Sequence, residues 1–196
     1  MNIRTIIASL TVLFLFTACQ AENPDSMKTM VDSSEIIAVA DETTAVEKVE
    51  VLGSFTTKFT AYPKSRALNI GIASERINGI VIHPNEIFSF NEATGPTNKE
   101  NGYKLAKIFV RGEEKEGYGG GVCQVSSTLL NAALDSDLEI LERHAHTKKV
   151  HYVAEGYDAA TSYGYKDFRF KNIYDYSIKI NSIVEDGAIT IAITAL

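Results

Sequence analysis

The chain has 196 residues, two cysteines and no tryptophan, and its formal net charge is −6 at pH 7. Residues 20–50 account for this acidity, because they hold eight acidic residues and two lysines; with Arg4 counted, residues 51–196 carry a net charge of −1. A near-neutral segment with no basic cluster along its sequence lacks the electrostatic signature of a nucleic-acid-binding protein, so no nucleic acid is expected as a partner.

The N-terminus has the pattern of an export signal. Arg4 precedes an uncharged apolar run from Thr5 to Phe16, which is shorter than the ~20 apolar residues of a membrane-spanning helix. The run ends where small residues meet Cys19, and this ending resembles a bacterial lipoprotein signal. We therefore expect residues 1–18 to be removed and Cys19 to carry a lipid that anchors the exported chain to the membrane of the cell envelope. The alternative is an ordinary cleaved signal, which also predicts export.

Residues 19–50 are predicted to form an acidic, disordered tether, because residues 20–50 have no aromatic residue and no sustained apolar period. Residues 51–196 are long enough to form a single domain with its own hydrophobic core. The sequence thus predicts a signal, a tether and one domain.

The first half of the domain is predicted to contain strands and one long helix. Residues 52–62 are rich in Thr and Phe and favour a strand, and apolar residues at helical spacing predict a helix at about 65–78 that ends at Gly79. Residues 80–96 are predicted to form a strand, a turn and a second extended piece. Residues 103–121 indicate either a hairpin around Gly112 and Glu113 or one strand followed by a loop.

The second half is predicted to begin with a helix and to end in antiparallel strands. Residues 122–134 place apolar side chains on one face, as in an amphipathic helix. Residues 138–153 and 160–194 are then dominated by β-branched and aromatic residues, and Asp186-Gly187 is a strong hairpin signal. The expected fold is α+β, a single domain in which the helix that carries Cys123 packs on a mainly antiparallel sheet.

Cys123 is the one thiol left in the mature chain if Cys19 is lipidated. Small exported domains usually pair their cysteines in disulfides, so a lone thiol favours a chemical role. The alternative is a buried cysteine that acts as a small hydrophobic residue. The sequence alone leaves both interpretations open.

The residues around Cys123, in the stretch GGGVCQVSST, could prepare it as a nucleophile. In the first turn of a helix, unpaired N–H groups and the helix dipole stabilise a thiolate and could receive an oxyanion. Gly120 and Gly121 would let a substrate approach the backbone closely. Gln124 adds a side-chain donor beside the thiol, although it could equally be an ordinary polar residue of the first turn.

A general base for the thiol is expected among the later histidines. His144 and His146 have period-two spacing, which would place both on one face of a strand, and either could form a thiolate–imidazolium pair. Asp158 or Asp167 could orient the ring. His146 and His151 lack a third ligand nearby, so neither a metal nor another cofactor is expected.

Several segments together resemble the VanW family. They are HPNEIFSFNEATGPTNKENGY, GGGVCQVSSTLLNAAL, LEILERHAHTKKVHYVAEGYDAA and YKDFRFKN, and the resemblance covers residues 52–196. The family is associated with vancomycin resistance and the cell envelope, and its domains have been regarded as cysteine L,D-transpeptidases that act on peptidoglycan. The resemblance therefore implies peptidoglycan stem peptides as partners.

The resemblance also implies roles for individual residues. Cys123 would be the nucleophile, and His146 of Arg143-x-x-His146 would be the base in preference to His144. Asp158 of Gly156-x-Asp158-Ala159 would orient the base, with Asp167 the next candidate. Arg143 could bind a substrate carboxylate or form a structural ion pair.

The implied reaction is attack of the thiolate on the carbonyl of the third residue of a tetrapeptide stem, with release of the terminal D-alanine. An amine of a neighbouring stem would then form a 3–3 cross-link, whereas water would make the domain a carboxypeptidase. Two other hypotheses remain: a non-catalytic module that binds peptidoglycan or D-Ala peptides, with Cys123 buried, and a tethered assembly factor for envelope enzymes.

Overall fold

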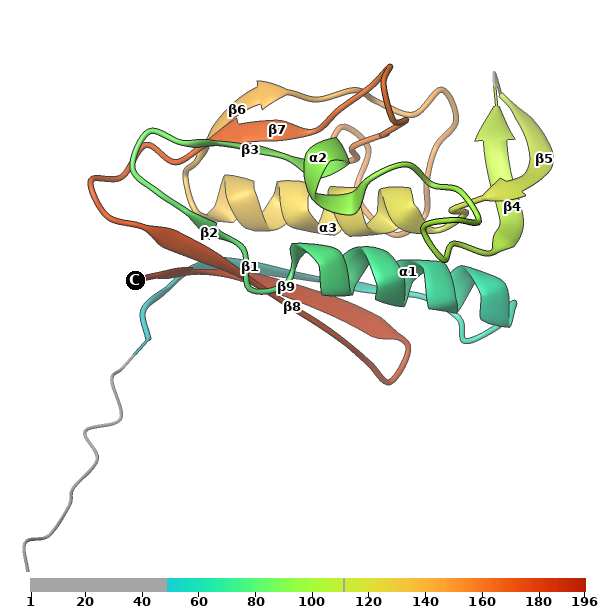
Figure 1. The fold of residues 1–196 in the computed structure, drawn as a ribbon, viewed down its shortest axis with the longest axis horizontal. Coiled ribbons are helices and arrows are strands. Elements are labelled where there is room, and N and C mark those ends of the chain that lie inside the picture. Colours follow the sequence, from blue (N-terminus) through green and yellow to red (C-terminus); the bar gives the residue numbers. More distant parts are fainter. Residues whose placement is uncertain (1–48, 111) are drawn as a thin grey trace, which may run out of the picture. The chain divides into compact units, whose positions relative to one another are not determined.

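The computed structural model describes residues 49–110 and 112–196, and Figure 1 shows their arrangement. The expected α+β fold is confirmed: helices pack against antiparallel sheets. The predicted signal, Cys19 and the tether up to residue 48 lie outside the described residues. The elements are β1 (Val51–Lys58), α1 (Lys64–Ile77), β2 (Val81–Ile82), β3 (Ile87–Ser89), α2 (Phe90–Thr94), β4 (Leu105–Val110), β5 (Glu113–Tyr118), α3 (Val122–Asp135), β6 (Glu139–Glu142), β7 (Arg169–Lys171), β8 (Ile178–Glu185) and β9 (Ala188–Ala195).

The main sheet has the strand order β1-β9-β8-β2 and is antiparallel throughout. Its central strands alternate in burial, so that Ile189, Ile191 and Ile193 of β9 are fully buried on one face. Helices α1 and α3 lie on this face, as Figure 1 shows. The N-terminal strand β1 pairs with the C-terminal strand β9, which joins the two ends of the domain in one sheet.

Helix α3 lies at the centre of the domain formed by the described residues. A second, smaller sheet with the order β3-β7-β6 lies on the side of α3 opposite the main sheet (Figure 1). Every residue from Val122 to Ala133 is buried except Cys123, which is partly exposed. The helix was predicted to be amphipathic, but a helix between two sheets is buried on nearly all sides. Cys123 is therefore the one position between Val122 and Ala133 where this helix is partly exposed.

Both hairpins are confirmed. Strands β4 and β5 pair directly around Gly112, and β8 and β9 pair around Asp186-Gly187. Asp186 and Gly187 both have positive φ, at 49° and 72°, which is the backbone conformation of the tight hairpin turn that the dipeptide predicted.

Two of the predicted extended segments are wrong. The second extended piece of residues 80–96 ends at Ser89, whose hydroxyl accepts a hydrogen bond from the N–H of Glu92 (3.1 Å) and so starts helix α2. The strand expected to carry His144 and His146 stops at Glu142, and both histidines lie in the irregular segment that follows β6. Their period-two spacing consequently does not place them on one strand face.

No helix formed by the described residues combines the length and the apolar character needed to cross a membrane.

Candidate active site

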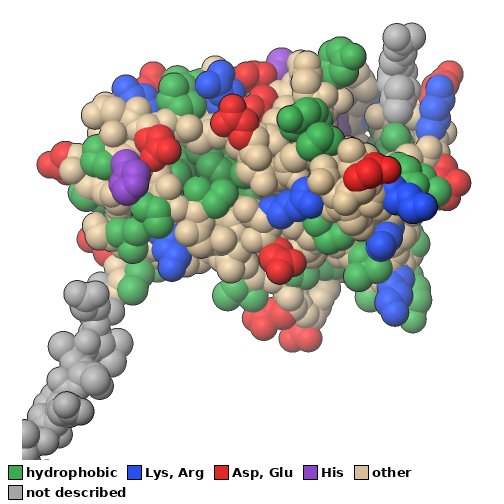
Figure 2. All heavy atoms as spheres, in the orientation of Figure 1, with side chains coloured by type: hydrophobic (Ala, Val, Ile, Leu, Met, Phe, Trp, Pro, Cys, Tyr) green, Lys and Arg blue, Asp and Glu red, His purple; other side chains and the backbone are tan. Residues whose placement is uncertain are grey.

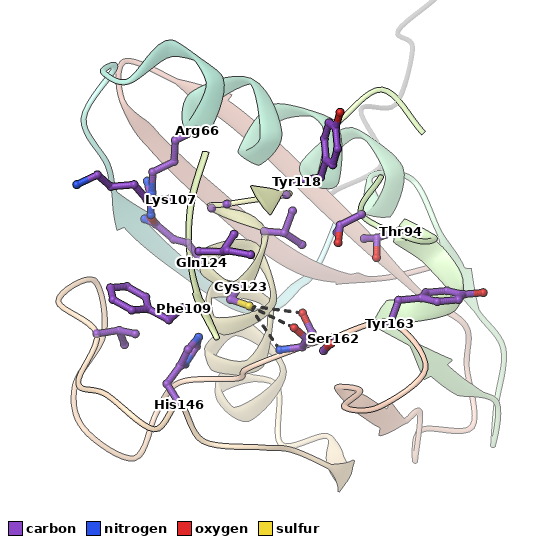
Figure 3. A pocket seen from close by; sticks show the side chains of 18 of the residues that line it. Arg66, Thr94, Lys107, Phe109, Tyr118, Cys123, Gln124, His146, Ser162 and Tyr163 are labelled. Atoms are coloured by element: carbon purple, nitrogen blue, oxygen red, sulfur yellow. Dashed lines mark hydrogen bonds between the residues drawn. The ribbon is translucent and has the colours of Figure 1, made fainter. Parts of the chain in front are cut away.

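Cys123 lies in the first turn of α3 and faces a cleft with two arms (Figure 3). The narrow arm, of about 290 Å³, is lined by residues of α2, of the β4–β5 hairpin and of the glycine turn before α3. The wide arm, of about 1080 Å³, is lined by the end of β1 and by segments 146–152 and 160–166. Both arms share Cys123, His146 and Arg66. The thiol is thus accessible from two directions.

The glycine turn is required by packing as well as by conformation. Gly119 and Gly121 have φ values of 83° and 109°, which strongly favour glycine. A Cβ atom on Gly120 would lie 2.4 Å from the backbone oxygen of Lys107 in β4. The turn therefore fits closely against β4 and fixes where α3 begins. Gly120 and Gly121 both line the narrow arm, as their expected role in substrate approach requires.

Backbone N–H groups are available beside the thiol. The N–H of Val122 donates to the oxygen of Gly119 (3.0 Å), and that of Gln124 donates to the oxygen of Gly121 (3.0 Å). Within residues 49–110 and 112–196, the N–H groups of Gly121 and Cys123 have no acceptor. Such unpaired donors at a helix start are what an oxyanion requires.

The structure brings His146 and Asp158 into direct contact. The Oδ2 atom of Asp158 accepts hydrogen bonds from Nδ1 of His146 (2.5 Å) and from its backbone N–H (2.7 Å). Two hydrogen bonds to one oxygen fix both the position and the rotation of the ring. With Nδ1 bonded to Asp158, Nε2 remains for the cleft, and Figure 3 shows the ring directed toward Cys123.

Arg143 holds the other side of the same carboxylate. Its Nη2 donates to Oδ1 of Asp158 (3.0 Å), and its Nε donates to the backbone oxygen of that residue (2.6 Å). Arg143 lines neither arm of the cleft. Of the two roles expected from the sequence, this arrangement matches the structural ion pair, which positions Asp158 under His146.

The electrostatics favour a thiolate–imidazolium pair. Burial raises the pKa of Cys123, but the nearby ring of His146 and its positive charge, together with hydrogen bonds from Thr161, lower it below its usual value. Burial lowers the pKa of His146, but the interactions with Cys123 and Asp158 raise it above its usual value. Both shifts stabilise the charged forms of the two groups.

In the resting geometry the sulfur is held by Thr161. The N–H of Thr161 donates to Sγ at 3.5 Å, and Sγ lies 3.6 Å from the backbone oxygen and 3.7 Å from the hydroxyl of the same residue. Among the described residues, no hydrogen bond of good geometry joins Sγ to His146, although the two groups shift each other's pKa. We expect the contact between Sγ and the His146 ring to shorten when a substrate binds.

Gln124 points away from the thiol. Its buried amide donates to the hydroxyl of Thr57 (2.9 Å) and to the backbone oxygen of Lys58 (3.0 Å), and its Oε1 accepts from Nη2 of Arg66 (2.7 Å). Both amide hydrogens are committed, so none is left for an oxyanion. The side chain instead ties the start of α3 to β1 and α1.

The two secondary candidates lie away from the cleft. His144 is bonded to Glu142 (2.9 Å), and the Asp167 carboxylate accepts hydrogen bonds from the hydroxyl of Ser89 (2.5 Å) and the N–H of Asn91 (2.9 Å) at the start of α2. Neither residue lines either arm. The structure therefore brings together Cys123, His146 and Asp158 and separates them from His144 and Asp167.

Sequence reasoning missed three residues of the cleft. Thr161 holds the sulfur, Tyr152 lines both arms, and Arg66 reaches the cleft from α1. Burial and the negative charge of Cys123 raise the pKa of Tyr152, so its phenol stays protonated and can donate a hydrogen bond. Tyr152 stands beside His151 in the segment quoted for its histidines, whereas nothing local in the sequence marks Arg66.

Comparison with known proteins shows which family this sequence matches. The family model described as "VanW like protein" matches residues 65–194. The chain is 43% identical over 155 residues to "Uncharacterized protein YoaR" of Bacillus subtilis (strain 168). The aligned region covers 79% of this chain and 51% of that relative. The chain is 29% identical over 133 residues to "Vancomycin B-type resistance protein VanW" of Enterococcus faecalis (strain ATCC 700802 / V583), with coverage of 65% and 48%. No solved structure matches significantly.

The chain spans about half the length of the curated relatives it matches. The family match nevertheless includes Cys123, His146 and Asp158 together with both long helices and most of both sheets. One relative carries vancomycin resistance in its name, which links the family to that phenotype. This protein belongs to the VanW family.

Proposed function

We propose that this domain is a cysteine acyltransferase that acts on peptidoglycan stem peptides, in the manner of an L,D-transpeptidase. One observation carries the proposal: Asp158 holds His146 by two hydrogen bonds, and His146 faces the partly exposed thiol of Cys123 at the start of a buried helix. A nucleophile, a base and a group that orients the base, arranged in this order, are the parts of a cysteine acyl-transfer site.

In the first half of the reaction, the Cys123 thiolate attacks the carbonyl carbon of the third residue of a tetrapeptide stem. The oxyanion that forms would be stabilised by the N–H groups of Gly121 and Cys123. The C–N bond to the terminal D-alanine then breaks, and the His146 imidazolium donates its proton to the departing amine. The products are a thioester on Cys123, free D-alanine and a neutral His146.

In the second half, the amine of a neighbouring stem attacks the thioester, and His146 takes the proton that the amine loses. The C–S bond breaks, the thiolate returns and a 3–3 cross-link is formed. Two arms that meet at Cys123 would give room for a donor and an acceptor at the same time. Water in place of the amine would give a carboxypeptidase.

The proposal includes the cellular setting expected from the sequence. Export and a lipid on Cys19 would hold the domain at the cell envelope, where peptidoglycan is found. The name of the Enterococcus relative, a vancomycin resistance protein, supports a role at the envelope.

The test incubates the purified domain with a disaccharide-tetrapeptide and follows Cys123 and the products by mass spectrometry. The expected result is a thioester on Cys123 whose mass shows loss of one D-alanine, followed by cross-linked dimers or tripeptide. The Cys123→Ala variant is expected to give neither. If it forms the same products as the parent, Cys123 is not the nucleophile and the mechanism is wrong.

His146→Ala and His144→Ala form a matched pair of variants, because the two histidines are two residues apart and only His146 lines the cleft. We expect His146→Ala to abolish thioester formation in a folded domain and His144→Ala to retain it. A folded parent domain that binds the stem peptide without forming an adduct would instead identify a binding module.

A further inference from the structure

Arg66 is a cation held at the junction of the two arms. It comes from the first turns of α1, and its Nη2 donates to Oε1 of Gln124 at 2.7 Å. Gln124 is itself only 1% exposed and is fixed by its hydrogen bonds to Thr57 and Lys58. Arg66 and Cys123 line the same two arms, so the guanidinium and the thiol open into one cleft, in which Figure 3 labels both residues.

The cleft around Arg66 is lined by cations and by no acidic side chain. Neither arm is lined by an Asp or Glu side chain, and within the described parts of the chain Arg66 forms no ion pair. The face of the molecule shown in Figure 2, by contrast, carries basic and acidic side chains side by side. Further cations line the cleft: Lys107 in the narrow arm and Lys58, Lys148, Lys149 and Lys166 in the wide arm. Lys107 pairs with Glu114 (2.7 Å) and Lys149 lies 3.9 Å from Glu155, so Arg66 differs from these two in having no acidic partner among the described residues.

A cation in this position can bind an anionic group of the ligand. Burial lowers the pKa of Arg66, yet an arginine side chain remains charged at neutral pH. With Nη2 bound to Gln124, the other N–H groups of the planar guanidinium remain for a carboxylate, which they can bind through two parallel hydrogen bonds. Arg143 cannot serve in this way, because Asp158 already occupies it.

We propose that Arg66 binds the C-terminal carboxylate of the amino acid that leaves in the acyl-transfer step. This inference rests on the proposed function and adds to it a residue, Arg66, that selects the substrate. Consecutive Cα atoms are about 3.8 Å apart, so the carboxylate of a single leaving residue lies about one residue beyond the attacked carbonyl. A carboxylate anchor in the same cleft as Cys123 would select peptides that end one residue after the bond to be broken.

The test measures binding in the Cys123→Ala background, so that it does not depend on catalysis. The probes are a stem tetrapeptide with a free C-terminal carboxylate and the same peptide as its C-terminal amide, with Kd determined by calorimetry. We expect amidation to weaken binding about 10- to 100-fold when Arg66 is present, as for loss of a hydrogen-bonded charge pair. In Arg66→Gln, amidation should change Kd less than about 3-fold.

Two further variants separate the anchor from general effects. Lys64→Gln removes one charge from the same helix at an exposed position outside the cleft, and it should retain the full cost of amidation. Arg66→Lys keeps the charge but loses the planar fork, and it should retain part of that cost. Thermal unfolding confirms that each variant is folded.

The outcomes separate this inference from the proposed function. Equal binding of acid and amide by the parent, no binding of either, or an undiminished amidation cost in Arg66→Gln would each overturn the carboxylate anchor. An Arg66-dependent amidation cost in a protein that forms no thioester would establish the anchor and refute the acyltransferase.

Discussion

The hydroxyl of Ser127 on α3 accepts a hydrogen bond from the backbone N–H of Ala159 at 2.9 Å, while it donates to the backbone oxygen of Cys123 at 2.7 Å. The neighbouring Ser126 hydroxyl donates to the oxygen of Ala159 at 2.7 Å. The helix that carries the thiol is thereby joined to the segment that carries Asp158. These hydrogen bonds set the position of the Asp158 carboxylate relative to the sulfur.

We predict that Ser127→Ala destabilises the domain by about 1–3 kcal/mol, because it leaves the buried N–H of Ala159 without an acceptor. Since Asp158 is the preceding residue, the variant should also slow alkylation of Cys123 by about tenfold or more. Ser182→Ala is the matched control, because it removes a buried hydroxyl that is bonded to Ser74 (2.6 Å) away from the cleft. Unfolding in urea and iodoacetamide kinetics measure the two effects, and equal alkylation rates in both variants would contradict the positioning role.

Asp158→Asn is expected to lower the rate of acyl transfer by about 10²- to 10⁴-fold. Both neighbours of the carboxylate are donors, His146 on one oxygen and Arg143 on the other. Asparagine offers one acceptor oxygen in place of two, so its NH2 must face one of these donors, and the hydrogen bonds that orient the His146 ring are weakened or lost. Steady-state kinetics of D-alanine release measure the change. Glu142→Gln serves as the control, since Glu142 bonds to His144 outside the cleft, and it should keep activity close to that of the parent.

The pH dependence of Cys123 alkylation is the third prediction. His146 lowers the pKa of Cys123 against the effect of burial, so the thiolate and its reactivity should appear at a lower pH than for a free thiol with a pKa near 8.5. In His146→Ala the effect of burial remains, and the alkylation profile should move to higher pH. Rates measured from pH 4 to 10 locate both midpoints. A parent midpoint at or above that of a free thiol would contradict the ion pair.

Much of this fold could be predicted because its elements carry local signals. The period of α1, the glycine before α3 and the Asp186-Gly187 turn each depend on neighbours in sequence. The strand expected around His144 and His146 fails for a physical reason: the backbone after Glu142 is held by side chains, as when Asp158 accepts the N–H of His146, instead of by a neighbouring strand. Side-chain acceptors from distant segments leave no periodic signal.

The reacting residues of the candidate site could be predicted from the sequence, but the residues that hold them in position could not. Cys123, His146 and Asp158 were selected by residue type and by resemblance, and the structure brings them together. Gln124 could not be placed correctly, because its direction is set by Thr57 and Arg66, more than fifty residues upstream. Contacts of this range follow from the pairing of β1 with β9 and the packing of both on α3, which no local pattern contains.

The fourth prediction concerns stability in acid. Burial raises the pKa of Asp158, but the hydrogen bonds and charge of His146 lower it below its usual value. A carboxyl group whose pKa is lower in the folded state stabilises the fold above its unfolded pKa of about 3.9 and loses this contribution as the pH falls through the folded value. The stability difference between the parent and Asp158→Asn should therefore shrink as the pH falls from about 5 to about 2. Urea unfolding at several pH values measures it, and a constant difference would refute the coupling.

The final prediction concerns the turn that presents Cys123. Gly120→Ala would place a Cβ atom 2.4 Å from the backbone oxygen of Lys107, and a backbone neighbour cannot move aside as a flexible side chain can. We expect a loss of about 2 kcal/mol or more in the free energy of unfolding.

Gly71→Ala is the matched control for this change. Gly71 lies within α1 with nothing within 4 Å of the added Cβ atom, so the substitution should stabilise the helix by about 0.5–1 kcal/mol. The two variants add the same methyl group with opposite expected signs. Urea unfolding gives both values. Gly120→Ala should also change the rate of Cys123 alkylation, because β4 and the start of α3 must separate to admit the methyl group. Gly71→Ala should leave that rate unchanged. If Gly120→Ala is as stable as the parent, the close contact with β4 does not fix the start of α3.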